Sequence, residues 1–206
     1  MTTKQSQRST TVKFLLIGCG ALSVLLLCGL IVVAQNFVRP LFVTIGPDEV
    51  GVVISPFEVT GLLERPLTSG NHMIRLGEHV EIYKISRETF SSSSAPGCCT
   101  DGSGGAVIHA KDDKTITAYY QIVYGVDPQQ VIKLHQNWQH HYKSDYVIPQ
   151  SKRTIEKIAG AYSSDEIIFT RKAEIEQSIF TELSLAFSEE GLYLSDFKFG
   201  DIRLKE

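Results

Sequence analysis

The pattern of hydrophobic positions changes several times along the chain, and each change marks a predicted element. Residues 14–34 are uncharged and almost continuously apolar. As an α-helix this run is ~31 Å long at about 1.5 Å per residue, which matches the hydrocarbon core of a bilayer. We therefore predict a membrane anchor whose most apolar positions are Phe14, Leu15, Leu16, Leu25, Leu26, Leu27, Ile31, Val32 and Val33.

A cleaved signal peptide and a lipoprotein signal are the alternatives to an anchor. A signal peptide usually has an apolar region of about 7–15 residues, which is shorter than this run. Residues 32–34 could nevertheless serve as a small-residue cleavage site, so that alternative stays open. Residues 16–19 resemble a lipoprotein box, but only Phe14 and Leu15 are apolar ahead of it. An uncleaved anchor fits the pattern best.

Basic residues around the apolar run predict its orientation. Lys4, Arg8 and Lys13 precede it, whereas Arg39 follows it closely. The positive-inside rule then places the N-terminus in the cytoplasm and the rest of the chain across the cell membrane, as a single-pass protein. Because the charge difference is small, a monotopic or a reversed arrangement is left open.

Beyond residue 46, short β-branched and alternating runs predict strands at 50–54, 71–76, 79–86, 106–110 and 115–125. The polar residues 111–114 form the turn of a predicted hairpin. Residues 91–105 are predicted to be a loop, because glycine and serine dominate them. Residues 41–45 could either dip into the membrane or begin the first strand.

The period becomes helical at Asp127, a good N-cap, and Pro128, which suits the first helical position. Further helices are predicted over 147–159 and from 163 until Gly191, which stops the last one. A final strand follows. The order of strands, helices and strand predicts an α+β domain over 47–206, after a cytoplasmic tail (1–13), the anchor (14–34) and a juxtamembrane segment (35–46).

Several short motifs, in a fixed order behind the apolar run, resemble the stomatin/prohibitin/flotillin superfamily, known as the SPFH or Band 7 domain. The resemblance covers residues 43–204. It rests on segments containing Pro47, Gly51, Gly70, His72, Asp112, Asp127, Pro128, Arg153, Arg171 and Gly191. Two features depart from the family pattern. Asn71 separates Gly70 from His72, and the 91–105 loop is longer than usual.

This resemblance implies a wedge-shaped domain that assembles side by side into large membrane-bound rings or cages. Family members contact membrane lipid, organise membrane microdomains and associate with membrane proteases or channels. The resemblance implies no catalytic residue and no cofactor. Family members usually continue into a long charged helical region, so we expect this chain to be either a fragment or a short member.

Charge narrows the classes of partner. Of 20 Lys and Arg residues, three lie in the first 13 positions, which leaves 17 against 23 Asp and Glu residues after residue 34. This acidic balance argues against nucleic acid as a partner and against a basic surface that binds anionic lipid.

The stretch GCCTDGSGG contains Cys98 and Cys99 and is the first candidate for chemistry. A thioredoxin-type site needs Cys-x-x-Cys at a helix N-terminus, and a phosphate loop needs a Gly-Lys-Ser/Thr ending before a helix. Neither pattern is present. A vicinal or intermolecular disulfide and an unpaired, incidental pair of cysteines both remain open.

The histidines of LHQNWQHHY are the second candidate. His135 and His140 lie about 140° apart on a helix, so they do not converge as an i, i+4 metal-binding pair. We expect them and His141 to face solvent or an interface, and Trp138 to lie in the core. A thiol- or metal-dependent enzyme is the alternative function, and a monomeric, membrane-tethered binding domain is another.

The helix from about residue 170 to 190 is the strongest interaction candidate. Its apolar stripe is surrounded by Arg171, Lys172, Glu174, Glu176, Glu182, Glu189 and Glu190. Under the family resemblance, these charges could pair with a neighbouring protomer. A solvated helix face accounts for the same pattern, and both interpretations stay open.

Overall fold

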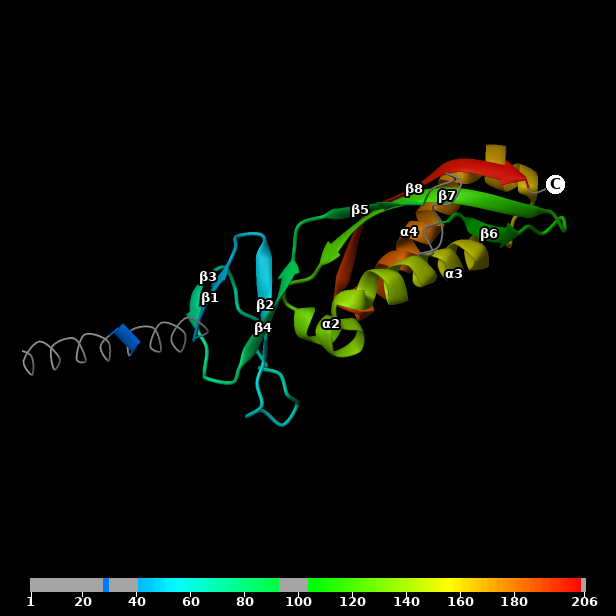
Figure 1. Ribbon diagram of the computed structural model, residues 1–206. Coiled ribbons are helices and arrows are strands. Elements are labelled where there is room, and N and C mark those ends of the chain that lie inside the picture. The colour runs from blue at the N-terminus through cyan, green and yellow to red at the C-terminus, as the bar shows by residue number, and fades with distance from the viewer. Residues whose placement is uncertain (1–27, 30–40, 93–103, 205–206) are drawn as a thin grey trace, which may run out of the picture. The chain divides into compact units, whose positions relative to one another are not determined.

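A computed structural model describes residues 28–29, 41–92 and 104–204 of the chain. Strands and helices follow in the predicted α+β order (Figure 1). Within the described ranges no helix combines the length and apolarity needed to cross a bilayer. The predicted anchor lies outside the described residues except for Cys28 and Gly29, which are helical.

The chain divides into two compact units. The first contains residues 28–29, 41–43 and 71–77 among those described, and the second contains 44–70 and the described residues from 78 onward. Strand β1 (Phe42–Ile45) pairs with β3 (Gly70–Met73), and Ile74 extends the pairing by donating its backbone N–H to the Leu41 carbonyl. Residues 41–45, for which the sequence leaves two possibilities open, therefore begin the first sheet.

A second two-stranded sheet lies within the larger unit. Strand β2 (Glu49–Ile54) pairs antiparallel with β4 (His79–Lys84), and its central Gly51 exchanges two backbone hydrogen bonds with Leu67. Four consecutive residues of β2 are buried, as expected of a β-branched run with no polar alternation.

The main sheet is built around the long strand β7 (Thr115–Val126). One edge of β7 pairs first with β6 (Ala106–His109) and then with β5 (Glu88–Ser91), while β8 (Leu192–Leu204) runs antiparallel along the other edge. The predicted hairpin turn at 111–114 is confirmed. The sequence does not predict strand β5, because its four residues are mostly polar and give little strand signal. Its last residue, Ser91, lies at the start of the predicted 91–105 loop.

The helical segments are α2 (Val131–Trp138), η2 (Gln139–His141), η3 (Lys143–Val147), α3 (Ile148–Ala159), η4 (Glu166–Thr170) and α4 (Lys172–Glu189). The helix predicted to begin at Asp127 and Pro128 is interrupted where Gln139 adopts φ 50°. A tight 3₁₀ turn and a π-helical turn continue the chain from there to α3.

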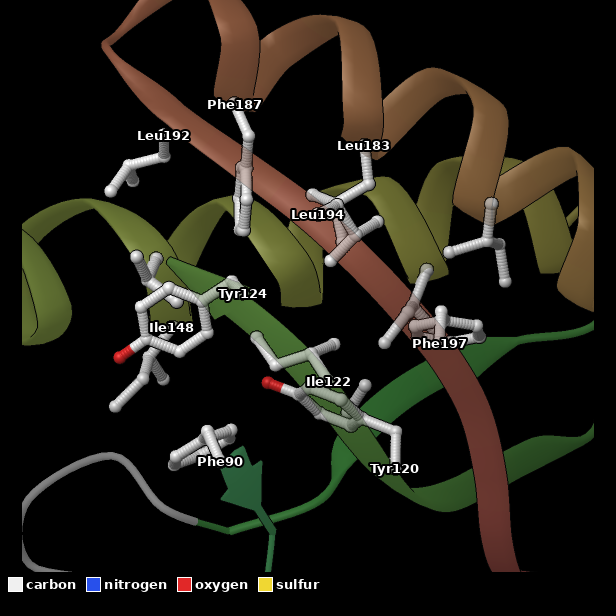
Figure 2. Close-up of a cluster of buried hydrophobic side chains, with 14 of the residues drawn as sticks. Phe90, Tyr120, Ile122, Tyr124, Ile148, Leu183, Phe187, Leu192, Leu194 and Phe197 are labelled. Carbon is white, nitrogen blue, oxygen red and sulfur yellow. The ribbon is translucent and has the colours of Figure 1, made fainter. Parts of the chain in front are cut away.

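The core lies between β7, β8 and the helices. Alternate residues of β7, including Tyr120, Ile122 and Tyr124, face α3 and α4 (Figure 2). Helix α4 contributes Ile175, Ile179, Leu183 and Phe187, spaced four residues apart on one face. This spacing is close to the helical period, so a single apolar stripe seals the sheet.

Candidate functional sites

The most concentrated group of ionisable side chains joins β4 to α2 and η2. The Tyr83 hydroxyl lies 2.7 Å from Nδ1 of His135. Both side chains are deeply placed, since Tyr83 is 2% exposed and His135 is 8% exposed. Tyr83 points inward because alternate residues of a strand share a face, and His135 follows Val131 and Leu134 on the buried side of α2.

Two further histidines meet at a single carboxylate beside this pair. Oε1 of Glu81 lies 3.0 Å from Nε2 of His79, and Oε2 lies 2.7 Å from Nε2 of His140. The His140 ring stacks on Tyr83, with centroids 4.5 Å apart and planes 11° from parallel. We name Glu81, Tyr83, His135 and His140, together with His79, the β4–α2 cluster.

Burial and hydrogen bonding shift the pKa values of three groups in this cluster. Burial lowers the pKa of His135, because it disfavours the charged ring, and it raises the pKa of Tyr83. The hydrogen bond from His140 lowers the pKa of Glu81, which keeps that carboxylate ionised. The described residues hold no group of three or more side chains arranged for a metal ion.

The prediction that all three histidines face solvent or an interface is wrong for His135. His135 and His140 both lie against the Tyr83 ring, with centroids 5.9 Å and 4.5 Å from it. Their hydrogen-bond partners, Tyr83 and Glu81, come from β4, more than 50 positions earlier in the sequence. His141 is exposed, as expected. No helical spacing signals a partner on a distant strand, so the sequence could not reveal this cluster.

A second polar group ties the β6–β7 turn to the segment before η4. The Asp112 carboxylate accepts hydrogen bonds from the backbone N–H of Ser164 at 3.0 Å and from its hydroxyl at 2.6 Å. The hydroxyl hydrogen bond is the main reason that the pKa of Asp112 falls to about 2. Lys114 completes the group with an ion pair to Asp112 at 3.2 Å. This turn is therefore anchored and is more than a simple connection.

Helix η4 begins with a reciprocal hydrogen-bonding arrangement. The Ser163 N–H donates to the Glu166 carboxylate at 2.9 Å, while the Glu166 N–H points back to the Ser163 hydroxyl at 3.4 Å. Arg171 then pairs with Glu174 at 2.6 Å and with Glu166 at 3.5 Å. Through these two ion pairs, Arg171 links η4 to the start of α4.

Several of the charges around α4 have partners inside the chain. Glu182 pairs with Lys157 of α3, Glu176 accepts the backbone N–H of Phe199, and Glu190 accepts the Trp138 indole N–H at 2.8 Å. These three side chains therefore have partners within the chain, and pairing of the α4 charges with a neighbouring protomer stays a prediction. Trp138 packs at the edge of the core, with its indole nitrogen turned toward Glu190.

The outward face of α4 also carries uncharged positions. Leu185 is 63% exposed, and it lines a shallow groove with Gln177, Ser178, Thr181 and Glu182. Phe169, in the preceding turn, is 74% exposed. Leu185 is thus the aliphatic side chain of a groove whose other lining residues are polar.

Exposed apolar side chains also gather in the smaller unit. Phe42 of β1 is 59% exposed, Met73 of β3 is 76% exposed, and Leu76 is 57% exposed. Phe42 follows the predicted anchor closely in sequence, and Met73 and Leu76 belong to the same unit as Phe42. Large apolar groups left open on so small a unit suit an apolar environment.

The predicted motif residues lie in structurally distinct places. Pro47 forms the turn between β1 and β2, Gly70 begins β3, and His72 lies within β3. Asp127 accepts the Gln129 N–H at 2.9 Å, and the following Pro128 leads into α2. Arg153 is exposed on α3. Pro47, Gly70, Asp127 and Pro128 therefore lie at turns or at the ends of elements, whereas His72 and Arg153 lie within a strand and a helix.

Gly191 shows most clearly why one motif position needs its residue. Its φ is 79°, and a Cβ there would lie 2.8 Å from the Gln130 carbonyl oxygen. Its own carbonyl accepts the Asp127 N–H at 3.0 Å, so the end of α4 meets the start of α2. Glycine is the residue that tolerates both the backbone conformation and the close approach.

Cys98 and Cys99, the residues of the predicted disulfide, lie outside the described residues, as do the nine apolar anchor positions. A comparison with curated proteins found no match. A comparison with protein families matched residues 43–206 to the SPFH domain / Band 7 family. The chain belongs to the SPFH/Band 7 family. The resemblance inferred from its motifs is thereby confirmed.

Proteins of this family share several general properties. SPFH proteins are membrane-associated, typically oligomerise at membranes and commonly scaffold membrane microdomains. They are generally non-enzymatic. The α+β fold agrees with the SPFH domain, and the match begins at residue 43, within β1.

Proposed function

We propose that this SPFH protein is a membrane-anchored, oligomeric scaffold that organises a membrane patch and its associated membrane proteins or proteases. The observation that carries the proposal is the family match over residues 43–206, which closely follows the uncharged apolar run at 14–34. The run provides a single anchor, and the basic residues before it place the N-terminus in the cytoplasm and the SPFH domain outside.

The smaller unit supports contact with lipid. Phe42, Met73 and Leu76 are all more than half exposed in the part of the chain that follows the anchor. Burying these side chains in an apolar layer stabilises the bound state by about 25 cal/mol per Å² of apolar surface removed from water. The SPFH domain would then sit against the bilayer in addition to being tethered to it.

The mechanism of such a scaffold is mechanical. Each anchored protomer presents the next at a high effective concentration, so weak contacts between domains add up across an assembly. Many anchors held in a ring enclose a membrane patch and restrict access to a client. The outer face of α4 is the proposed contact surface, because Leu185 remains exposed in its groove.

The test compares two equivalent substitutions in the full chain, solubilised in a mild detergent. Leu185→Glu places a charge in the α4 groove, whereas Val107→Glu places the same charge at another exposed apolar position, 46% exposed on β6. Native mass spectrometry or light scattering should show oligomers for the unaltered protein and for Val107→Glu, and smaller species for Leu185→Glu.

Two outcomes would contradict parts of this proposal. An unaltered protein that stays monomeric at every concentration contradicts the scaffold and favours a tethered binding domain. Oligomers that survive Leu185→Glu unchanged contradict the α4 face as the contact surface.

A further inference from the structure

The hydrogen bond between Tyr83 and His135 can run in either direction, and burial of both groups favours one of them. Among the described residues, His135 Nδ1 is the partner of the Tyr83 hydroxyl, at 2.7 Å. A buried phenol hydrogen requires an acceptor, so we assign Tyr83 as donor and the neutral His135 ring, protonated on Nε2, as acceptor. Tyr83 cannot serve as a phenolate acceptor instead, because burial raises its pKa.

A second proton on His135 removes this acceptor. Nδ1 then carries hydrogen, so the phenol hydrogen of Tyr83 loses its partner while both groups remain enclosed. Leaving a buried polar group unsatisfied is unfavourable, and so is enclosing the new charge on a ring that is only 8% exposed. The contact between β4 and α2 is therefore built for the neutral form of His135.

The neighbouring charges do not reverse this preference. Glu81 on β4 attracts a proton on His135, whereas His140 on η2 repels it, and burial outweighs both in lowering the pKa of His135. Tyr142 packs near Tyr83 with ring centroids 6.4 Å apart, and burial raises the pKa of its phenol, which stays neutral. Glu81 stays ionised through the weakly acidic range, because its pKa is lowered.

We propose that the β4–α2 cluster is a pH-sensitive latch: protonation of His135 removes the acceptor of the Tyr83 hydroxyl hydrogen, places a charge in the buried contact and so weakens the hold of β4 on α2. The sign follows from linkage. A histidine whose folded pKa lies below its unfolded value of about 6.5 contributes stability at neutral pH that is lost as pH falls through 6.5. Acidification from pH 7.5 to 5.5 therefore raises the opening equilibrium of α2 by up to about tenfold. This device does not depend on the proposed assembly.

Hydrogen exchange of the full chain in detergent tests the latch, with rates corrected for the intrinsic effect of pH. The amides of α2 should lose up to about tenfold in protection between pH 7.5 and 5.5, while those of α4 serve as the internal reference. His135→Asn keeps an acceptor near the Nδ1 position but does not titrate, so its α2 protection should be independent of pH. His141→Asn, an exposed neighbour, should behave like the unaltered chain.

A further variant tests whether His140 causes the pH dependence. In His140→Asn the loss of α2 protection at low pH should persist, because His135 is still present. Equal pH dependence in the unaltered chain and His135→Asn overturns the proposal, and so does pH-independent protection of α2 in the unaltered chain.

A second measurement covers the case in which His135→Asn does not fold. In the unaltered protein, NMR of the imidazole nitrogens should show His135 protonated on Nε2 at neutral pH and titrating below about 6.5. Titration at or above that pH, or protonation of Nδ1 at neutral pH, overturns the latch.

Discussion

At the scale of single residues, Asp112 offers the clearest pH dependence outside the latch. Hydrogen bonds from Ser164 hold its pKa at about 2, below the usual 3.8. A carboxylate with a lowered folded pKa stabilises the protein above its unfolded pKa, and this stabilisation is lost as pH falls from about 4 toward 2. In Asp112→Asn that contribution is absent. We therefore expect the melting temperature of the unaltered chain to fall more steeply than that of the variant between about pH 4.5 and 2.5.

The adjacent Asp113 provides the control for this comparison. It lies in the same turn with a positive φ of 61°, a conformation that asparagine also tolerates. Asp113→Asn changes the net charge equally but leaves the Ser164 hydrogen bonds in place. Calorimetry over the same pH range should give the steep fall for Asp113→Asn. Parallel slopes for all three proteins would contradict the assigned role of Asp112.

Residue-level chemistry is the part that the sequence predicts least. The local pattern correctly places Asp112 in a hairpin turn, but its partner Ser164 lies 52 positions later. The helical period correctly places His135 on a helix, but the hydroxyl that it binds belongs to β4. Local patterns indicate conformation, whereas a hydrogen bond between distant segments depends on how the whole core packs. The candidate site is therefore not predictable from the sequence, although its histidines stand out there.

At the scale of elements, β7 and β8 meet at an unusual pair. Gly125 lies opposite Tyr193, and a Cβ on Gly125 would lie 2.5 Å from the Cζ and hydroxyl oxygen of the Tyr193 side chain. The ring therefore crosses the space left by the glycine, and its hydroxyl donates to the Ile85 carbonyl at 3.3 Å. Gly125→Ala should displace the ring and destabilise the protein by about 1–3 kcal/mol, measured by chemical denaturation.

A double-variant cycle identifies the cause of that loss. If the collision with Tyr193 is responsible, Gly125→Ala should cost much less when Tyr193→Ala is already present. The two effects should then be clearly non-additive, as expected of residues in direct contact. Additive costs would show instead that alanine is unfavourable at position 125 for a reason independent of Tyr193.

Elements with a strong period are predicted well from the sequence, and irregular ones are not. The β6–β7 hairpin, α3 and the long α4 follow from turn residues and from apolar positions four apart. Strand β5 escapes prediction because Glu88–Ser91 is short and largely polar. The interruption after Trp138 escapes it because Gln139 adopts a positive φ without the glycine that usually signals one. Tertiary packing overrides local preference at these places.

At the scale of the whole molecule, the exposed apolar side chains divide into two groups with different proposed roles. Leu185 belongs to the larger unit and lies in a polar groove, which suits another protein surface. Met73 belongs to the smaller unit together with Phe42, and Phe42 lies close in sequence to the predicted anchor. The family match alone does not separate these roles, because it covers residues of both units.

Lipid contact by the smaller unit can be tested with a single fluorescent residue. Trp138 is the sole tryptophan of the chain, so Trp138→Phe gives a background free of indole. In this background Met73→Trp should be quenched by brominated lipids in reconstituted bilayers, because position 73 is 76% exposed in the proposed membrane-facing unit. Leu185→Trp, at a similarly exposed position on α4, should not be quenched. Equal quenching at the two positions, or none at position 73, would show that the smaller unit does not use its exposed side chains to contact lipid.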